Sequence, residues 1–299
     1  MNLAPVILFA YKRLDTLKKT IEALQKNNLA SQSDFYVFSD AAKTIKDEDA
    51  VRKVREYLRT ICHFKSFIIE EAEVNKGLAN SIIQGVTKVF EKHDFVIVIE
   101  DDLVTSTNFL NFMNDSLQKF QYESSVFSIA GYSFDLNLTQ SIHTDTYFLN
   151  RGWSWGWATW KDRWEKIDWE ISDYHTFIKN REERKAFSKG GSDLNKMLDK
   201  QMSGKLDSWA IRWIYNQYKM KGLTIYPVYS KVKNEGFGKD ATHTIGSSRR
   251  YKPFFDEEAK TTFTYPENLA ITNIAQLKFQ RKMGYFSRIK SKIETLLRL

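Results

Sequence analysis

Cysteine is almost absent from this chain. Cys62 is the only one among 299 residues, so no intramolecular disulfide can form, and a reducing compartment such as the cytoplasm is expected. The first residues, MNLAPVILFAYKR, have no basic segment before their short apolar run, which argues against a signal peptide. No apolar stretch is long enough to cross a bilayer. These absences predict a cytoplasmic protein without a membrane span.

The glycine motifs that cradle nucleotide phosphates are also missing. No G-x-G-x-x-G follows the first apolar run and no G-x-x-x-x-G-K-[ST] occurs, which excludes a dinucleotide fingerprint and a P-loop. Basic residues outnumber acidic ones by 45 to 37, and the net charge of +8 favours anionic ligands such as nucleotides, pyrophosphate or a lipid surface. No basic stripe interleaves with aromatic residues along one element outside the tail, so nucleic acid is not an expected partner.

Short apolar runs alternate with amphipathic segments in the first 120 residues. The pattern predicts strands over residues 5–10, 35–39, 66–70 and 96–99, with helices over 14–24, 48–59, 78–89 and 109–120. Strand–helix alternation is typical of right-handed crossovers and a mostly parallel sheet. We therefore expect a Rossmann-like α/β fold whose ligands bind at the carboxyl ends of the strands.

The fourth predicted strand ends in three acids, in the stretch VIVIEDDLV. Glu100, Asp101 and Asp102 repel one another, so water, a helix N-terminus or a divalent cation must offset the cost of packing them at a strand end. Asp40 ends the second strand and is expected at the same edge. Aspartate oxygens suit Mg²⁺ or Mn²⁺, and either ion can bridge two phosphates. The cluster thus predicts a metal-assisted diphosphate site.

Four segments in this order, FAYKRLDTLKKTIEAL, YVFSDAAK, NKGLANSI and VIVIEDDLV, resemble the nucleotide-sugar half of GT-A glycosyltransferases. The resemblance is to inverting enzymes of the family-two type and of the N-acetylglucosaminyltransferase I type, which has a Glu-Asp-Asp motif. It continues through RGWSWGWATWKDRW and LDSWAIRW, a pattern similar to that of bacterial surface-polysaccharide transferases, and covers about residues 3–245. It implies a nucleotide-sugar half at 1–125, an acceptor half of the same domain at 126–265, and a tail at 266–299.

The resemblance also implies roles for single residues on the strand-end edge. Asp102 would contact the metal. The other donor-site residues would line the base, ribose, diphosphate and donor sugar: Tyr11, Arg13, Asp40, Asn75, Lys76, Gly77, Glu100 and Asp101. Simpler interpretations stay open, since Asp40 could cap a turn, Lys76 could be a solvated lysine, and Arg13 a surface cation.

The second half of the chain is rich in tryptophan. Trp153, Trp155 and Trp157 alternate with other residues, which predicts a strand with all three rings on one face. Such rings pack in a core or form a platform for a sugar, because indole joins a broad apolar face to a hydrogen-bond donor.

Two later residues complete the predicted site. Asp207 or Ser208 is expected to cap a helix, and the resemblance places the general base of inverting enzymes at Asp207. His243 lies where many GT-A enzymes have a histidine that contacts the metal or the diphosphate, although a lone histidine often has another role.

The tail has apolar residues at helical spacing, with basic residues on the other faces. It predicts one amphipathic helix from Phe279 that binds an anionic membrane surface, or alternatively packs on its own domain or a second subunit.

Together these features predict a metal-dependent inverting glycosyltransferase. It would move a sugar from a nucleotide sugar, with UDP as the expected nucleotide, to a saccharide or lipid-linked acceptor, with the enzyme on the inner face of the membrane. A sugar-nucleotide pyrophosphorylase is the first alternative, but AYKRLD lacks the glycine-rich loop that it would need. A non-catalytic carbohydrate-binding protein would explain the tryptophans but not the ordered acids.

Overall fold

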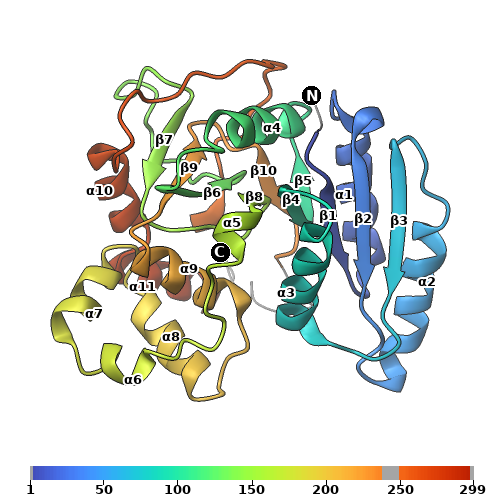
Figure 1. Cartoon of the computed structure of the whole chain (residues 1–299), viewed down its shortest axis with the longest axis horizontal. Coiled ribbons are helices and arrows are strands. Elements are labelled where there is room, and N and C mark those ends of the chain that lie inside the picture. The colour runs from blue at the N-terminus through green and yellow to red at the C-terminus, as the bar shows by residue number, and fades with distance from the viewer. Residues whose placement is uncertain (1–2, 238–248, 297–299) are drawn as a thin grey trace.

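The central sheet is mixed and eight-stranded, in a computed structural model that describes residues 3–237 and 249–296. Its order is β3-β2-β1-β4-β8-β6-β9-β7, from right to left in Figure 1. The strands are β1 (Val6–Ala10), β2 (Asp34–Ser39), β3 (Ser66–Glu71), β4 (Phe95–Glu100), β6 (Val126–Ala130), β7 (Thr146–Leu149), β8 (Trp157–Trp160) and β9 (Leu223–Pro227).

The first four strands are parallel, as the alternation of the sequence predicts. The expectation of a mostly parallel sheet needs correction further along, because β8 runs antiparallel to β4 and β6, and β7 runs antiparallel to β9. A separate two-stranded sheet pairs β5 (Leu103–Thr105) with β10 (Val232–Asn234). The predicted boundaries at residues 125 and 265 stay predictions.

Helices cover both faces of the sheet. Alternate residues of β1 point to opposite sides, so Val6 and Leu8 join one core cluster while Ile7 and Phe9 join another. The first cluster receives α1 (Leu14–Gln25), α2 (Glu48–Leu58), α4 (Phe109–Lys119) and α10 (Asn273–Lys282). The second receives α3 (Gly77–Phe90), α5 (Lys161–Trp164) and α9 (Trp209–Lys219). A smaller cluster lies between α9 and the helices α6 (Tyr174–Phe177), α7 (Arg181–Ser188) and α8 (Leu194–Met202).

The tryptophan row is not one continuous strand. β8 begins only at Trp157, and Gly156 before it has a φ of +61°, which breaks the alternation. The Trp157 ring lies 4.3 Å from that of Trp213 and 5.0 Å from that of Trp209, in the cluster under α9. Trp153 and Trp155 pack instead against Tyr132, on the other side. The prediction that three rings share one face is therefore wrong.

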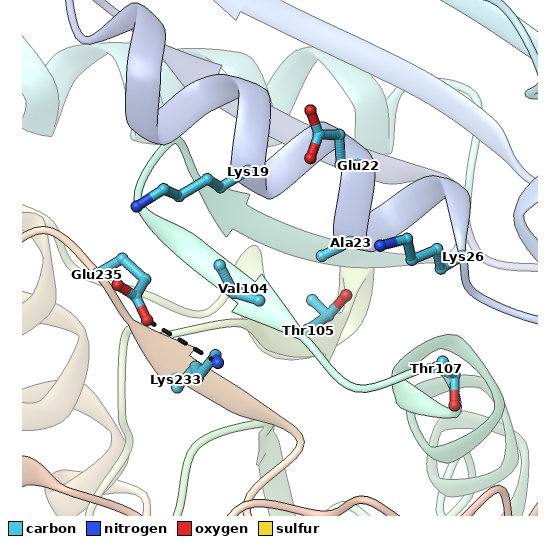
Figure 2. Close-up of a pocket in the computed structure, with 9 residues that line it drawn as sticks. All are labelled: Lys19, Glu22, Ala23, Lys26, Val104, Thr105, Thr107, Lys233 and Glu235. Carbon is cyan, nitrogen blue, oxygen red and sulfur yellow. Dashed lines mark ion pairs between the residues drawn. The ribbon is translucent and has the colours of Figure 1, made fainter.

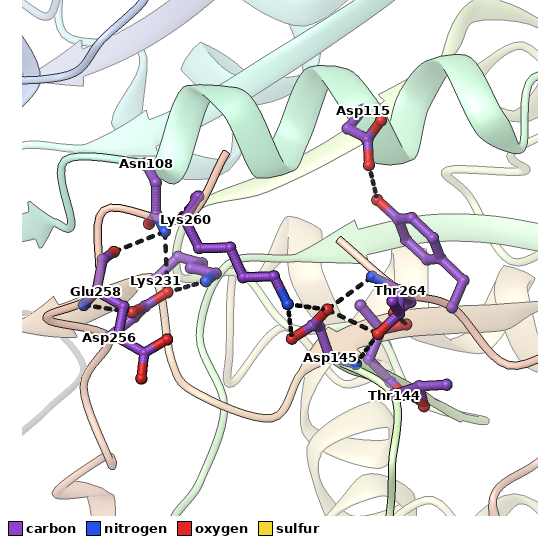
Figure 3. A network of polar contacts seen from close by, with 11 residues as sticks. Asn108, Asp115, Thr144, Asp145, Lys231, Asp256, Glu258, Lys260 and Thr264 are labelled. Atoms are coloured by element: carbon purple, nitrogen blue, oxygen red, sulfur yellow. Dashed lines mark hydrogen bonds and ion pairs between the residues drawn. The ribbon is translucent and has the colours of Figure 1, made fainter. Parts of the chain in front are cut away.

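A long segment without regular structure, residues 252–272, is tied to the body by polar contacts (Figure 3). The amide of Asn108 donates to Asp256 Oδ2 at 3.0 Å, and Lys231 forms a buried ion pair with the same carboxylate. Further along, Lys260 Nζ lies 2.7 Å from the carboxylate of Asp145. The Asn108 and Lys231 contacts give the buried Asp256 carboxylate its partners, whereas the Lys260–Asp145 pair lies nearer the surface.

The tail forms two helices rather than one. α10 ends at Lys282, and α11 (Tyr285–Leu296) starts after Met283 and Gly284. Phe279 and Met283 are buried in the domain, whereas Phe286 is 85% exposed. α10 therefore packs on its own domain, as one of the two alternatives for the tail predicts. The expectation of one continuous amphipathic helix is wrong. Within the described ranges, no helix combines the length and apolarity needed to cross a membrane.

Candidate functional site

Parallel pairing brings the ends of β1, β2 and β4 to one edge of the sheet. Phe9 pairs with Glu100, and Ala10 pairs with Ser39, so the residues that follow these strands are neighbours. Asp40 and the start of α3 also lie at this edge, because the Asp40 carboxylate binds the α3 backbone. The location agrees with the general rule for ligand sites in open α/β sheets.

The charge of the strand-end acids is offset within the chain itself. Arg13 Nη2 lies 2.5 Å from Asp101 Oδ1 and 2.9 Å from Asp102 Oδ2. The backbone N–H of Tyr11 donates to Asp101 Oδ2 at 3.3 Å. Asp101 and Asp102 are only 5% and 8% exposed. Arg13, which the sequence left open as a phosphate contact or a surface cation, is thus the counter-ion of both aspartates.

Burial shifts the proton equilibria of this cluster. Loss of hydration, with the charges of Asp102 and Asp101 adding to it, raises the pKa of Glu100 to about 8. Burial also raises the pKa of Asp101 to about 6, since loss of hydration outweighs the opposing effect of Arg13. At neutral pH Glu100 therefore carries a proton, and the cluster holds less negative charge than its sequence suggests.

Gly236 lies directly against Asp102. A Cβ on this glycine would stand 2.0 Å from Asp102 Oδ2, so a larger residue could not occupy the position without moving the carboxylate. The N–H of Glu235 donates to the backbone oxygen of Asp102 at 2.8 Å, which ties the end of β10 to the acid cluster. This close approach is the reason for the glycine here.

Few side chains at the strand-end edge are placed to hold the predicted metal ion. In residues 3–237 and 249–296, no three His, Cys, Asp or Glu side chains converge to hold an ion. His243 lies outside the described residues. Asp102 is the carboxylate predicted to contact an ion at this edge, and its Oδ2 is paired with Arg13. Mg²⁺ in nucleotide sites is commonly held by one or two carboxylates together with substrate phosphates, so this donor set fits an ion that arrives with a diphosphate, but not an all-protein metal site.

Asp40 and the residues predicted to lie beside it do come together. Asp40 Oδ1 accepts from the N–H of Lys76 at 2.9 Å, and its Oδ2 accepts from the N–H of Gly77 at 3.0 Å and from Asn75 Nδ2 at 3.1 Å. Gly77 has a φ of +73°, which favours glycine. The carboxylate therefore joins the end of β2 to the start of α3, which is the geometry of the turn-cap alternative.

Tyr11 and Lys76 have partners of their own. The Tyr11 hydroxyl donates to Asp47 Oδ2 at 3.2 Å and accepts from the N–H of Lys43 at 3.0 Å. Lys76 Nζ donates to Gln84 Oε1 at 3.0 Å. Both side chains lie near the strand-end edge, and their roles toward a nucleotide stay predictions.

Asp207 precedes α9 and is open to solvent. Ser208 caps this helix, since its Oγ accepts from the N–H of Ile211. The side chain of Asp207 is 65% exposed, with Arg212 Nη2 at 3.4 Å. Trp209 packs on Trp157, which pairs with Val98 two residues before Glu100. Trp209, in the first turn of α9, thus packs near the C-terminal end of β4.

Of the three predicted platform rings, one has an accessible part. Trp157 is 0% exposed and Trp153 is 8% exposed, so both faces of these rings pack against protein and the platform role does not fit them. Trp155 is half-buried and lies 5.8 Å from Phe237 and 5.4 Å from Tyr251, measured between ring centroids. Sequence reasoning missed these two partners, because they come from distant segments with no shared spacing.

A polar groove of about 410 Å³ lies between α1, β5 and β10 (Figure 2). Lys19 of α1 and Lys26, which follows α1, line one side of it, and Lys233 and Glu235 line the other, with Lys233 Nζ 3.9 Å from Glu235 Oε1. Glu235 connects the groove to the site, since its N–H binds the Asp102 backbone. The charged residues that line the groove are lysines and glutamates, and the buried aspartates of the acid cluster are not among them.

Several solved structures share a distant similarity with the chain. No family model and no curated protein matches the chain. Among solved structures, TarS of S. aureus is 14% identical over 43% of this chain and 21% of that chain, with a TM-score of 0.32. A structure of TarS residues 1–349 in complex with UDP is also 14% identical, with a TM-score of 0.32. This match covers 43% of this chain and 34% of that chain. The mannosyltransferase PcManGT from Pyrobaculum calidifontis, in complex with GDP-Man and Mn²⁺, is 12% identical over 54% of this chain and 48% of that chain, with a TM-score of 0.35.

These matches span less than half of the proteins concerned. No conclusion about this chain rests on similarities of this size, and its function is argued from the geometry of the strand-end edge.

Proposed function

We propose that the chain is an inverting glycosyltransferase that moves a sugar from a nucleoside diphosphate sugar, with UDP as the expected nucleotide, to a saccharide or lipid-linked acceptor. The observation that carries the proposal is the juxtaposition of the Arg13–Asp101–Asp102 cluster with the Asp40-anchored start of α3, at the carboxyl edge of a sheet without a glycine cradle. Surface-polysaccharide synthesis is the proposed setting.

Mn²⁺ or Mg²⁺ is the proposed cofactor. Asp102 would hold it, with His243 as a second contact to the ion or the diphosphate. When bound, such an ion neutralises the diphosphate and so favours its departure. Arg13 would hold the Asp101 and Asp102 carboxylates in place, and Glu100 would face the donor sugar or support the loop.

Transfer itself needs a base and no covalent intermediate. The Asp207 carboxylate would accept the proton of an acceptor hydroxyl as its oxygen bonds to the anomeric carbon. The bond from that carbon to the diphosphate oxygen breaks at the same time, and the configuration inverts. An exposed carboxylate at the start of α9, restrained by Arg212, supports this assignment.

Residues Tyr11, Asn75, Lys76 and Gly77 are the proposed base, ribose and diphosphate contacts, and Asp40 positions the last three. Trp155 is the ring of the predicted platform that has surface to offer a sugar.

Calorimetric binding of UDP and GDP, with and without Mn²⁺, tests the donor site. Asp102→Ala should weaken nucleoside diphosphate binding about tenfold or more and abolish the effect of the metal. Asp207→Asn should keep donor affinity and lower turnover about 10²- to 10⁴-fold. Asp135→Asn, an exposed carboxylate in another loop, is the matched control.

Two results would reject the assignment. Diphosphate binding that ignores both the metal and Asp102→Ala would remove the donor site, and full turnover by Asp207→Asn would remove the base. Turnover of a nucleoside triphosphate with a sugar phosphate would instead favour a pyrophosphorylase, and sugar binding without turnover a carbohydrate-binding protein.

We also propose a peripheral association with the inner face of the membrane through α11. Its exposed apolar residues are the support: Tyr285, Phe286, Ile289 and Ile293. At about 100° per residue these four side chains fall within an arc of about 100° on the helix. Arg288 and Lys290 flank the arc, which suits anionic headgroups.

A further inference from the structure

Three aromatic rings from separate segments meet beside Asp102. Trp155 precedes β8, Phe237 follows β10, and Tyr251 ends a 3-10 helix (Arg249–Tyr251). Their ring centroids are 5.8 Å (Trp155–Phe237), 5.4 Å (Trp155–Tyr251) and 5.6 Å (Phe237–Tyr251) apart, and each side chain is half-buried. Phe237 directly follows Gly236, which lies against the Asp102 carboxylate. These three rings, here termed the aromatic shelf, therefore adjoin the acid cluster.

The shelf is supported from beneath by buried side chains. The hydroxyl of Tyr132, which is 0% exposed, donates to the backbone oxygen of Tyr251 at 2.8 Å, and its ring lies 4.6 Å from that of Trp155. Phe134 packs on Tyr251 from the same core, with its ring at 5.7 Å. Rings held in this way lose little conformational entropy when a ligand packs on them.

Arg250 stands at the margin of the shelf with unused hydrogen-bonding capacity. Its guanidinium carbon lies 4.5 Å from the centroid of the Tyr251 ring, and Nη2 donates to the Tyr251 hydroxyl. Its Nε and Nη1 are shielded from water and have no acceptor among the described residues. Buried donors without acceptors are costly, and a guanidinium fork matches the oxygens of a phosphoryl group.

The arginine that contacts Asp102 is already engaged. Arg13 binds Asp101 and Asp102, so turning it toward an incoming anion would leave two buried carboxylates without their counter-ion. Lys76 Nζ donates to Gln84 Oε1, so this cation also has a partner within the chain. Arg250, at the margin of the shelf that adjoins the acid cluster, thus keeps two donors, Nε and Nη1, without an acceptor in the part of the chain that the structure describes.

We propose that Arg250 binds a phosphoryl group of a substrate and that the sugar attached to this group packs on the aromatic shelf. The inference rests on the proposed transferase function for the nature of the substrate, and it adds a phosphate contact that the sequence did not indicate. The phosphoryl group is either part of the donor diphosphate or carried by the acceptor.

Isothermal titration separates these two sources. UDP and uridine are titrated in Mg²⁺ into the wild type, Arg250→Gln, Arg250→Lys and the control Lys252→Gln, an exposed cation in the same segment. Inorganic phosphate is then titrated with UDP present at saturation. Circular dichroism checks that each variant is folded.

If the donor diphosphate is the ligand, Arg250→Gln weakens UDP binding about ten- to a hundredfold and leaves uridine binding unchanged. If the acceptor carries the phosphate, UDP affinity is unchanged, and phosphate binding seen in the wild type is lost in Arg250→Gln. Arg250→Lys keeps the positive charge but not the planar pair of N–H donors. Its affinity for the ligand should therefore lie between those of the wild type and Arg250→Gln. Lys252→Gln should match the wild type.

A folded Arg250→Gln variant that binds UDP and phosphate as the wild type does would overturn the inference. A wild type that binds phosphate through Arg250 but shows no affinity for UDP would keep Arg250 as an anion site and reject the proposed donor. Failure of the wild type to bind either probe would reject both.

Discussion

At the scale of single residues, the acid cluster shows how far side-chain types alone can lead. Three consecutive acids after an apolar run indicate a site that needs positive charge, and that much follows from the sequence. The sequence does not say that Arg13, some ninety positions earlier, supplies it, since the contact depends on β1 and β4 pairing in register. The fit of Gly236 against Asp102 has no sequence signal either, because it joins segments that are distant in the chain.

Arg13→Met should lower the free energy of unfolding by about 2–3 kcal/mol. Removing one partner of a buried pair typically costs about 3–5 kcal/mol, and the 24% exposure of the Arg13 side chain lets water offset part of this. Denaturant unfolding in metal-free buffer measures the change.

Lys12→Met is the control, because the Lys12–Asp47 pair is more exposed and solvent-screened, so its loss should change stability far less than the loss of Arg13. Equal effects of the two substitutions would mean that Asp101 and Asp102 do not depend on Arg13.

At the scale of elements, the first 120 residues were predictable because each segment has a clean period. The predicted strand at 66–70 and helix at 48–59 match β3 and α2 within a residue. The tryptophan segment was not predictable in the same way, because Gly156 adopts a left-handed conformation and ends the alternation. The alternation of tryptophans over residues 153–157 does not reveal that the backbone bends just before Trp157.

Asp40→Ala should destabilise the connection between β2 and α3. The carboxylate accepts from the N–H groups of Lys76 and Gly77, and loss of such a helix-start acceptor costs about 1–2 kcal/mol. Hydrogen exchange should show faster opening of the amides of Lys76 and Gly77 in particular. Asp135→Ala is the control: the Asp135 side chain is exposed and its Oδ1 accepts from the N–H of Asn137, far from α3 in the sequence, so these amides should be unchanged.

The buried pair between Arg151 and Asp193 gives a pH prediction. It links the segment after β7 to the start of α8, with Nη1 and Nη2 at 2.8 Å and 3.0 Å from the carboxylate oxygens. Burial alone would raise the pKa of Asp193, but Arg151 outweighs it and the pKa is lowered. A lowered carboxyl pKa stabilises the fold above the unfolded value of about 4, and this contribution is lost as the pH falls through the folded value.

Asp193→Asn should therefore cost about 3 kcal/mol at pH 7, and the cost should shrink as the pH falls below about 4, because the wild type then progressively loses the same contribution. Thermal unfolding of both proteins between pH 3 and pH 7 measures this convergence. Parallel curves would contradict it. Asp162→Asn, whose side chain is 53% exposed beside Arg163, should give a small difference at every pH.

At the scale of the whole molecule, the sheet and the tail mark the limit of sequence reasoning. Local alternation predicted β1 to β4, but the antiparallel insertion of β8 between β4 and β6 depends on long-range pairing that no local pattern encodes. In the tail, apolar residues at helical spacing continue from Phe279 to Ile293. The body of the domain covers only the first part of this stripe, and it leaves Phe286 and Ile293 exposed.

The membrane proposal for α11 predicts a measurable loss of vesicle binding. Phe286→Ser with Ile289→Ser removes two of the four exposed apolar side chains, whose burial in a bilayer is worth about 1.5–3 kcal/mol each in the most favourable case. Sedimentation with phosphatidylglycerol vesicles should fall at least tenfold, while wild-type binding should weaken with added salt and on phosphatidylcholine because Arg288 and Lys290 then contribute less.

Ile45→Ser is the matched control, since Ile45 is 81% exposed but belongs to a different helix, a 3-10 turn (Ile45–Asp47) before α2. It should bind vesicles as the wild type does. Equal sedimentation of the α11 variant and the wild type would contradict membrane binding through this face. If the α11 variant instead changed from dimer to monomer in light scattering, with vesicle binding absent in both proteins, the exposed stripe would be a contact between two copies of the chain, because the same apolar arc can be buried against a second subunit as well as against lipid.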